Sequence, residues 1–592
     1  MPAPVTRARP GEPQWPDDAT WAQLQQNVGG RLIRVQSPLT GCGAEPSNAE
    51  CTDLFKRLKN PYFLGDEVGL TQTLGWVGAW TSRPSTYAVV AQTTEDVTAA
   101  VNFARQRNLR LVVKGGGHSY QGTSNSADSL LIWTHRMDAT QLHDAFVGVG
   151  CDGRAAPQPA VTVEAGAIWG HVYEAVSTKA GRYVQGGGCL TVGVAGLVLG
   201  GGFGSFSKAF GTAAANLLQA EVITADGQVR IANACTNPDL FWALKGGGGS
   251  FGVVTRLTLR THDLPRFFGA VFMAIRATSD EAFRRLIERL VAFYAESLLG
   301  PHWGEQMAFR RDNVASVSMV SQGLEQGQPE AVWRPFLTWL AERPNDFSLE
   351  AAPVILSVPA RHFWDPEYLA KLPGVVLADD RPGVHPGDVF WAANLGEAAQ
   401  VLHAYQSSWL SRSLLKEDRR SDLCDRLFAA SRHHKVSLHF NKGLAGASAE
   451  VIEAARDTAT HPAVLDAFAL AICAAEEPPA YPGIPGHEPD LAAARRNADA
   501  VDKAMGEIRA GLPAAASYVS EGNYFEADWQ RSFWGSNYAR LLATKTSHDP
   551  QGLFFAHNGV GSEDWSNDGF VRATFPKSTN EKPVGPIDGK IP

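Results

Sequence analysis

The sequence predicts an α+β protein built from more than one domain, and three observations support this fold class. The chain has 592 residues, which is more than a single hydrophobic core usually accommodates. Short apolar strands alternate with helical patterns over residues 81–264, in the rhythm of an α/β unit. Over residues 265–511, long amphipathic helices accompany strands joined as hairpins, which is typical of an antiparallel sheet covered by helices.

Four segments are expected along the chain. Residues 1–80 show weak periodicity and form a lead-in segment, which a first domain at 81–264 and a second domain at 265–511 follow. Residues 512–592 form a C-terminal segment. Its stretch from 518 to 565 is rich in aromatic residues, Asn and Gly, so we expect it to fold back onto the first domain.

The first domain opens with a strand at 87–92. Thr93 or Thr94 then caps a helix whose apolar face contains Val97, Val101 and Ala104. The same patterns predict strands at 111–113, 130–134, 160–164 and 253–259, and helices at 169–179 and 237–245. Ala225-Asp226-Gly227 joins two further strands, at 221–224 and 228–231, as a hairpin.

The second domain begins near Pro265 with a strand at 269–275. Ser279 starts a helix with one apolar face, and a hairpin turns at Asp312-Asn313 within residues 307–320. A strand is expected at 436–441, and helices from there to about Gly511. The apolar run 463–475 carries Asp466 and is too short to span a bilayer, so it is interpreted as a core helix.

Composition excludes several classes of function. The formal net charge of −8 argues against nucleic-acid binding, and no polybasic patch indicates a membrane surface. Residues 1–15 contain four prolines and no apolar core, so no signal peptide is expected; the compartment stays open, with a cytoplasmic location favoured. The seven cysteines form no C-x-x-C pair, so no metal site is expected. Cys42 and Cys51 flank a short loop and either form a disulfide or remain two reduced thiols.

Two glycine-rich loops each carry a reactive side chain. The first reads Lys114-Gly115-Gly116-Gly117-His118-Ser119-Tyr120, and the second reads Gly186-Gly187-Gly188-Cys189-Leu190-Thr191-Val192-Gly193. Such loops let backbone N–H groups approach a flat or phosphate-bearing ligand closely. Taken singly, His118 is by default a loop histidine and Cys189 a small buried hydrophobe. Together they predict one cofactor held by both loops.

Two other glycine clusters do not predict nucleotide binding. Residues 247–252 match G-x-G-x-x-G, but a helix precedes them and a strand follows, which is the reverse of a dinucleotide-binding loop. Residues 200–204 do not complete the G-x-G-x-x-G pattern, because Ser207 occupies the position of the third glycine. A nicotinamide-binding Rossmann loop is therefore rejected.

The joint pattern resembles the berberine bridge enzyme-like group of the vanillyl alcohol oxidase-type flavoproteins. The resemblance covers residues 81–259 and 439–565, and beyond the two loops it rests on residues 200–204, 246–255, 534–538 and 549–550. It implies a two-part FAD-binding domain of the vanillyl alcohol oxidase type, formed by residues 81–264 and the returning segment 512–592. It also implies a substrate domain at 265–511 with an antiparallel sheet covered by helices.

The resemblance implies that FAD is attached covalently twice, through His118 to the 8α-methyl group and through Cys189 to ring carbon 6. Amides of the loops would bind the pyrophosphate, and three further residues would line the cofactor. The full set of expected cofactor-binding residues is His118, Cys189, Lys114, Gly115, Gly116, Gly117, Ser119, Gly188, Val192, Gly193, Gly196, Gly201, Gly204 and Val254.

The function that the resemblance favours is an oxidase. Hydride would pass to flavin N5 from an alcohol, a sugar hemiacetal or a natural-product C–H bond, and O2 would accept the electrons to give H2O2. In the family, valine three residues after the linked cysteine goes with oxidases and leucine with dehydrogenases; here that residue is Val192. The alternatives are a dehydrogenase that uses a quinone or another non-oxygen acceptor, and a flavin-binding protein without catalysis.

A catalytic base is expected among four residues. The family often uses the tyrosine of a Tyr-x-Asn segment; here Tyr518 matches the tyrosine, but Ser520 replaces the asparagine. Tyr120 is the second candidate. Period-two geometry in the strand 438–442 places His439 and Asn441 on one face, with Phe440 and Lys442 on the other, and the polar pair suits a hydroxylated substrate. Substrate identity and oligomeric state stay open.

Overall fold

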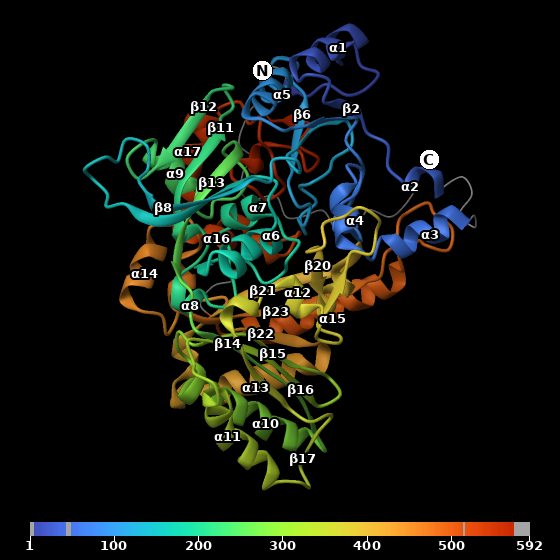
Figure 1. The fold of residues 1–592 in the computed structure, drawn as a ribbon. Helices are drawn as coiled ribbons and strands as arrows, with labels where there is room; N and C mark the ends of the chain where they lie inside the picture. The colour runs from blue at the N-terminus through green and yellow to red at the C-terminus, as the bar shows by residue number, and fades with distance from the viewer. Residues whose placement is uncertain (1–4, 43–48, 513–515, 574–592) are drawn as a thin grey trace.

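A four-stranded sheet lies at the top of the molecule. The computed structural model describes residues 5–42, 49–512 and 516–573. The sheet has the order β2 (Leu32–Arg34), β5 (Tyr87–Val90), β7 (Ser129–Trp133), β6 (Arg110–Lys114), with β5, β7 and β6 parallel. Helices α1 (Asp18–Asn27) and α5 (Thr94–Gln106) pack beside it (Figure 1). Thr93 caps α5 in a capping box with Asp96, so the expected cap is confirmed.

A six-stranded sheet lies next to it. Its order is β12 (Val229–Asn233), β11 (Leu217–Ile223), β13 (Val253–Asp263), β9 (Gln158–Glu164), β8 (Thr140–Phe146), and β10 (Arg182–Val184) also pairs with β13. The expected hairpin is the antiparallel pair β11–β12. The helices of this part are α6 (Trp169–Tyr173), which continues as a π-helix to Lys179, α7 (Val194–Leu199), α8 (Ser207–Phe210) and α9 (Pro238–Leu244).

A ten-stranded sheet crosses the lower half of the molecule (Figure 1). Its order is β17 (Phe347–Leu349), β14 (Phe267–Ala277), β16 (Val314–Gln322), β15 (Trp303–Phe309), β22 (Val436–His439), β23 (Ala467–Glu477), β21 (Gln400–Ser411), β3 (Thr73–Trp76), β4 (Trp80–Thr81), with β18 (Val354–Pro359) on β14. The largest buried core joins this sheet to α10 (Asp280–Phe293), α11 (Gln328–Ala341), α13 (Glu417–His433) and α15 (Leu491–Arg509). The α+β fold class is therefore confirmed.

The interpretation of residues 463–475 as a core helix is wrong. Residues 463–465 end a short 3-10 helix (Pro462–Leu465), and residues 467–475 belong to β23, which lies between β22 and β21 in the interior of the ten-stranded sheet. Its residues are buried on both faces, so the hydrophobic run shows no alternation. A short apolar run of this kind does not distinguish a buried strand from a buried helix. Here, hydrogen bonding to the neighbouring strands β21 and β22 makes the segment a strand.

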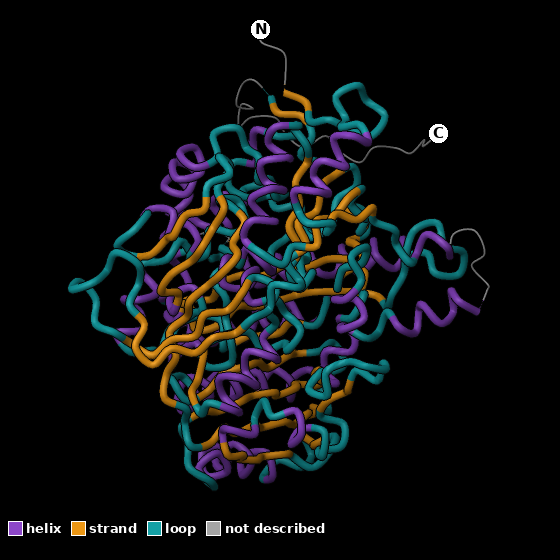
Figure 2. The backbone as a smooth tube through the Cα atoms, turned by 45° about the horizontal axis from the view of Figure 1, so that its top comes forward, coloured by secondary structure: helices purple, strands orange, loops and turns teal. Residues whose placement is uncertain are grey.

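Both ends of the chain contribute to the body of the molecule. The lead-in segment supplies β3 and β4 to the edge of the ten-stranded sheet. It also contains the helices α3 (Ala49–Arg57) and α4 (Pro61–Asp66). The C-terminal helices α16 (Trp529–Trp534) and α17 (Tyr538–His548) pack against the first domain, where the Trp534 indole donates to the carbonyl of Gly246 at 3.0 Å. Strands run through the interior of both halves, and most helices and loops lie outside (Figure 2).

Two disulfides connect parts of the chain, Cys42–Cys51 and Cys151–Cys235. The first was one of two readings of the sequence, and the second was not expected. Cys189, Cys424 and Cys473 are free thiols. Among the described residues, no helix is both long enough and apolar enough to cross a lipid bilayer.

Candidate functional site

The two glycine-rich loops touch each other through their backbones. The first loop follows β6, and the second runs from β10 to α7. A methyl group built on Gly116 would lie 2.6 Å from the amide nitrogen of Gly193, and one built on Gly204 would lie 1.7 Å from the carbonyl oxygen of Gly186. Contacts this short exclude any side chain. Glycine is therefore required at these positions for the loops to pack together.

His118 and Cys189 meet at one hydroxyl group. The Nε2 atom of His118 is 3.1 Å from Thr191 Oγ1, and Cys189 Sγ is 3.6 Å from the same oxygen. Both residues line a small cavity with Thr191. The other residues of this cavity are Pro61, Gln72, Phe390, Asn394, Glu397 and Ala398. Two side chains that are distant in sequence thus face one space.

Burial keeps both reactive groups uncharged near neutral pH. It lowers the pKa of the His118 imidazole to about 4, so the ring presents a free nitrogen lone pair. Burial, together with the nearby carboxylate of Glu397, raises the pKa of the Cys189 thiol to about 11. Because only a thiolate is strongly nucleophilic, reaction at Cys189 requires that a proton leave the sulfur first.

Unpaired polar groups around the cavity fit an anionic, hydrogen-bonding cofactor. Within the described part of the chain, the amides from Gly116 to Tyr120 donate to no protein acceptor. The side-chain Oε1 of Gln72 is buried and likewise without a partner. Consecutive amides of this kind form a concave site for phosphate oxygens. The residues present therefore fit FAD.

Other members of the expected cofactor set lie near the loops without pointing into the cavity. The Lys114 ammonium donates to the carbonyls of Glu67, Val68 and Leu70 at 3.2, 2.6 and 2.9 Å, so its side chain braces the lead-in segment. The hydroxyl of Ser119 accepts from the amides of Gln121 and Thr123 within its own loop. Contact of either residue with a cofactor would be through its backbone.

The remaining expected positions surround the second loop. Gly201 has a left-handed backbone with φ of +108°, and Val254 is buried in β13 opposite Val222 of β11. The carbonyl of Gly188 accepts from the Trp391 indole at 2.9 Å. Val192 is partly buried and packs against the core, whereas no protein atom lies within 4 Å of a methyl group built on Gly196.

Tyr120 points toward a cluster of acidic and phenolic groups. Its ring lies 5.0 Å from that of Tyr405 on β21. Burial raises the pKa of Tyr120 well above its usual value, and the carboxylates of Glu397 and Glu521 raise it further. Lys442 forms an ion pair with Glu521. Glu397 and Tyr405 belong to no local motif, so the sequence does not predict them as site residues, and Glu521 lies three residues after Tyr518 without a motif of its own.

Tyr518 is buried in the C-terminal segment, directly before the short 3-10 helix Val519–Glu521, and packs against the turn that follows α7. The amide of Gly202 donates to its hydroxyl at 3.3 Å, and its ring meets Phe203 edge-on at 5.0 Å. Burial raises the pKa of Tyr518 to about 12, and the charge of Glu521 acts in the same direction. Tyr518 and Tyr120 therefore both lie within the field of Glu521.

The expected alternation of side chains along residues 438–442 is wrong beyond His439. Strand β22 ends there, and the amide of Lys442 donates back to the His439 carbonyl at 3.2 Å. The turn separates Phe440, which stacks on Tyr294 in the core, from Lys442, which pairs with Glu521. Asn441 is buried with its Oδ1 unpaired, and burial holds the pKa of His439 well below its usual value.

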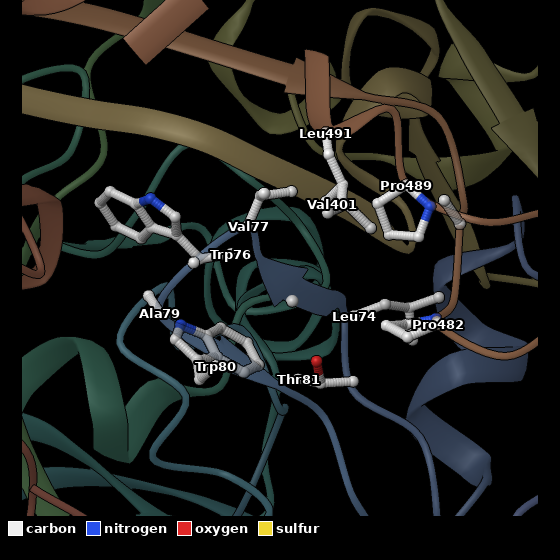
Figure 3. Close-up of a pocket in the computed structure, with 13 residues that line it drawn as sticks. Leu74, Trp76, Val77, Ala79, Trp80, Thr81, Val401, Pro482, Pro489 and Leu491 are labelled. Carbon is white, nitrogen blue, oxygen red and sulfur yellow. The ribbon is translucent and has the colours of Figure 1, made fainter. Parts of the chain in front are cut away.

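A larger groove is lined by Trp76, Trp80 and Val401 (Figure 3). Its volume is about 270 Å³, and the Trp80 indole at its edge donates to the carbonyl of Tyr120 at 3.1 Å. The lining is largely apolar and comes from β3, β4, β21 and the segment before α15: Leu74, Gly75, Trp76, Val77, Gly78, Ala79, Trp80, Thr81, Val401, Ala480, Pro482, Pro489 and Leu491.

Comparison with protein families matches the two parts that form this site. An FAD binding domain matches residues 85–233, and the berberine and berberine-like family matches residues 517–561. The first match contains both glycine loops, and the second contains Tyr518 and Glu521. The two families therefore cover His118, Cys189 and the C-terminal segment that packs beside them.

Relatives and solved structures match nearly the whole chain. The FAD-linked oxidoreductase malF of Malbranchea aurantiaca is 30% identical, over 95% of this chain and 93% of its own. The flavoprotein oxidase VAO615 of Thermothelomyces thermophilus is 28% identical over 96% and 94%, and the bifunctional decalin synthase calF of Penicillium decumbens is 28% identical over 96% and 95%.

The solved structure of the VAO-type flavoprotein MtVAO615 from Myceliophthora thermophila has a TM-score of 0.78, with 25% identity over 96% of this chain and 100% of that one. MtVAO713 from the same organism has a TM-score of 0.77 with 21% identity, covers 97% and 100% of the two chains, and supports the fold alone. The chain therefore belongs to the FAD-linked oxidoreductases of the vanillyl alcohol oxidase type, with a berberine bridge enzyme-like C-terminal segment.

Proposed function

We propose that this protein is an oxidase that carries FAD attached through both His118 and Cys189. The observation that carries the proposal is the convergence of the imidazole and the thiol on Thr191 Oγ1, at 3.1 and 3.6 Å. Two attachment points fix the position of a ring without enclosing it, so a wide substrate cleft stays open. FAD, when bound, supplies hydride acceptance at N5 and transfer of the electrons to O2.

The residues of the loops prepare the attachment. The neutral His118 ring offers a nitrogen lone pair at any pH well above 4. The thiol of Cys189 must lose its proton, and Thr191 Oγ1, 3.6 Å from the sulfur, can donate its own hydrogen to the thiolate that results. The unpaired amides from Gly116 to Tyr120 would bind the pyrophosphate oxygens. Residues 81–264 with 512–592 would thus form the FAD-binding part and residues 265–511 the substrate part.

Tyr518 is the proposed proton acceptor for the substrate hydroxyl. A phenol with a pKa of about 12 is a weak base at neutral pH, so Tyr518 must pass its own proton on. Glu521 is the carboxylate whose charge reaches both Tyr518 and Tyr120, and Lys442 balances that charge. Tyr120, with His439 and Asn441, would orient the substrate.

Use of O2 is supported by Val192 and by a relative of this chain. The smaller valine leaves more room beside the second loop than leucine would, and VAO615 is named a flavoprotein oxidase. The name of calF, a decalin synthase, supports a natural-product substrate. Most side chains that line the groove beside Trp80 are apolar. Trp80 separates this groove from Tyr120, and an apolar lining suits the hydrocarbon part of such a substrate.

We also propose that the protein matures in an oxidising compartment, in place of the cytoplasmic location that the sequence favours. The support is the pair of disulfides, because such bonds are rare in the reducing cytosol. Alkylation of the unreduced, unfolded protein should label two of the seven cysteines, Cys424 and Cys473, because Cys189 would carry FAD. Labelling of Cys42, Cys51, Cys151 and Cys235 would contradict this proposal.

The decisive experiment is the intact mass of denatured protein produced with ample flavin. The wild type should carry one FAD per chain. His118→Ala and Cys189→Ala should each retain FAD through the other residue, and the double variant should carry none. A wild-type mass equal to that of the bare polypeptide would reject the proposal. H2O2 formation with a panel of alcohols, sugars and polycyclic metabolites under air then separates an oxidase from a dehydrogenase.

A further inference from the structure

Two histidines and one aspartate form a cluster outside the flavin site. His171 belongs to α6, whereas His385 and Asp388 lie in the loop between β19 (Val376–Ala378) and β20 (Val389–Trp391). The Nε2 atom of His171 is 2.7 Å from Asp388 Oδ1, and one nitrogen or oxygen atom of each of the three side chains lies within 4.8 Å of the others. No other group of this kind occurs among the described residues.

We propose that His171, His385 and Asp388 bind one divalent transition-metal ion, with Zn²⁺ as the best match, and that this ion fastens the β19–β20 hairpin to α6. Two imidazole nitrogens and one carboxylate oxygen are ligands that Zn²⁺ prefers. The site contains no cysteine, so the absence of C-x-x-C pairs, which argued against a metal, does not bear on it.

The fold holds two of the ligands in place, and the third, His385, is held by a hydrogen bond that its Nδ1 accepts from the amide of Gly387 at 3.0 Å, which leaves Nε2 for an ion. Asp388 is nearly buried, and its amide donates to the His385 carbonyl at 2.9 Å, which fixes the spacing of these two residues. Trp169 anchors α6 in the core, two residues before His171. The ring of His385 is exposed and lies 5.7 Å from the His171 ring.

The distances are those of a site that closes slightly on binding. Ligands of one tetrahedral Zn²⁺, each about 2.0–2.1 Å from the ion, lie about 3.3 Å from one another. No two of the ligand atoms here are more than 4.8 Å apart, so the ligands need to approach one another by no more than about 1.5 Å. The ion takes the place of the hydrogen bond between His171 Nε2 and Asp388 Oδ1, and the neutral His171 ring then carries its hydrogen on Nδ1.

A fourth ligand is at hand. Glu174 lies three residues after His171, and its Oε2 is 3.2 Å from the position of a methyl group built on Gly387. Residues at this spacing share one face of a helix. Lys179 now pairs with Glu174 at 2.8 Å. Glu174 lies outside the group of three whose ligand atoms are within 4.8 Å of one another, so a water molecule completes four-coordination unless Glu174 leaves Lys179 and moves closer.

The ion would act on the flavin site through the hairpin. Phe390 of β20 lines the cavity that contains His118 and Cys189, and the Trp391 indole donates to the carbonyl of Gly188. On the other side, the amide of Gly170 donates to the carbonyl of Leu190 at 2.7 Å. Fastening the hairpin to α6 therefore holds the second glycine loop between them.

The experiment measures Zn²⁺ binding by the flavin-loaded full chain. After treatment with EDTA and desalting, the protein is dialysed against micromolar ZnCl2, and the metal is counted by mass spectrometry. We expect one Zn²⁺ per wild-type chain and at least tenfold weaker binding by His385→Ala, whose side chain is exposed. His362→Ala is the matched control. His362 contacts Asp365 at 2.9 Å, and these two residues are three positions apart in the sequence, as His385 and Asp388 are, but in the described part of the chain no third ligand lies beside them. The His362→Ala variant should therefore bind Zn²⁺ like the wild type.

Hydrogen exchange gives an independent measure. Zn²⁺ should slow exchange of the amides at 376–391 in the wild type and in His362→Ala, but not in His385→Ala. The proposal is overturned if the wild type retains no zinc, if His385→Ala binds it as tightly as the wild type, or if His362→Ala loses it equally, because the last two results would indicate general binding to surface histidines.

Discussion

The two halves of the site are built in different ways. On the FAD side, backbone atoms of two glycine loops come within 2.6 Å of where a side chain would begin. On the substrate side, side chains from β21, β22, the 392–397 turn and the C-terminal segment meet around Tyr120, Tyr405 and Glu521. A close backbone contact tolerates only glycine, whereas side chains brought together from distant strands can be exchanged. The first half is therefore suited to holding a constant cofactor, and the second to varying a substrate.

The largest effect is expected on the substrate side. Tyr518→Phe removes the proposed proton acceptor without changing the size of the ring, and flavin reduction by substrate should slow by at least ~10²-fold, the lower end of what general-base groups contribute. Anaerobic stopped-flow absorbance of the flavin measures this rate. The covalent flavin content should not change. If Tyr120→Phe slows reduction more than Tyr518→Phe does, the two tyrosines exchange roles.

On the FAD side, Gly116→Ala should disrupt the contact between the loops. The added methyl group would lie 2.6 Å from the amide nitrogen of Gly193, so the loops must separate. We expect the free energy of unfolding to fall by ~1–3 kcal/mol and covalent FAD to be lost in part. Gly65→Ala, where the methyl group meets no atom within 4 Å, is the control. Equal flavin content and equal denaturation midpoints in both variants would refute the requirement for glycine.

Val192→Leu sharpens the comparison because it changes the FAD side without touching substrate residues. The bulkier side chain should slow reoxidation of the reduced flavin by O2 about threefold to tenfold, which corresponds to ~1 kcal/mol in the barrier. Reduction by substrate should keep its rate. Air-saturated and anaerobic stopped-flow traces separate the two half-reactions, and an unchanged reoxidation rate would remove Val192 as a determinant of oxygen use.

The smallest effect expected is a shift in pH dependence. Burial, and then the charge of Glu521, raise the pKa of Tyr518, so flavin reduction that needs the phenolate should rise with pH up to about 12. Glu521→Gln removes a negative charge and leaves Lys442 unpaired, and both changes lower the phenol pKa. The profile should move to lower pH by about one unit. Glu526→Gln, which alters a carboxylate paired with Arg509, should leave it unmoved. The reverse shift would contradict this account.

Local signals predicted local structure well. The cap at Thr93, the β11–β12 hairpin and the helix after Asn237-Pro238 follow from residues within a few positions of one another. Segment 463–475 failed because its strand identity depends on β21 and β22, which lie elsewhere in the sequence. Beyond His439 the alternation failed because the strand ends there. In the first case contacts with distant strands overrode a pattern that was ambiguous by itself, and in the second a local turn ended the strand.

The sequence by itself determined the cofactor class and the two residues proposed to attach it, because close backbone approach leaves a visible run of glycines. It also determined the family and the α+β fold class. Only the tertiary structure decided which carboxylates surround the tyrosines, that the Lys114 side chain braces the lead-in segment, and that His171 meets His385 and Asp388. These contacts join residues up to hundreds of positions apart, and no local pattern records which distant side chains folding brings together.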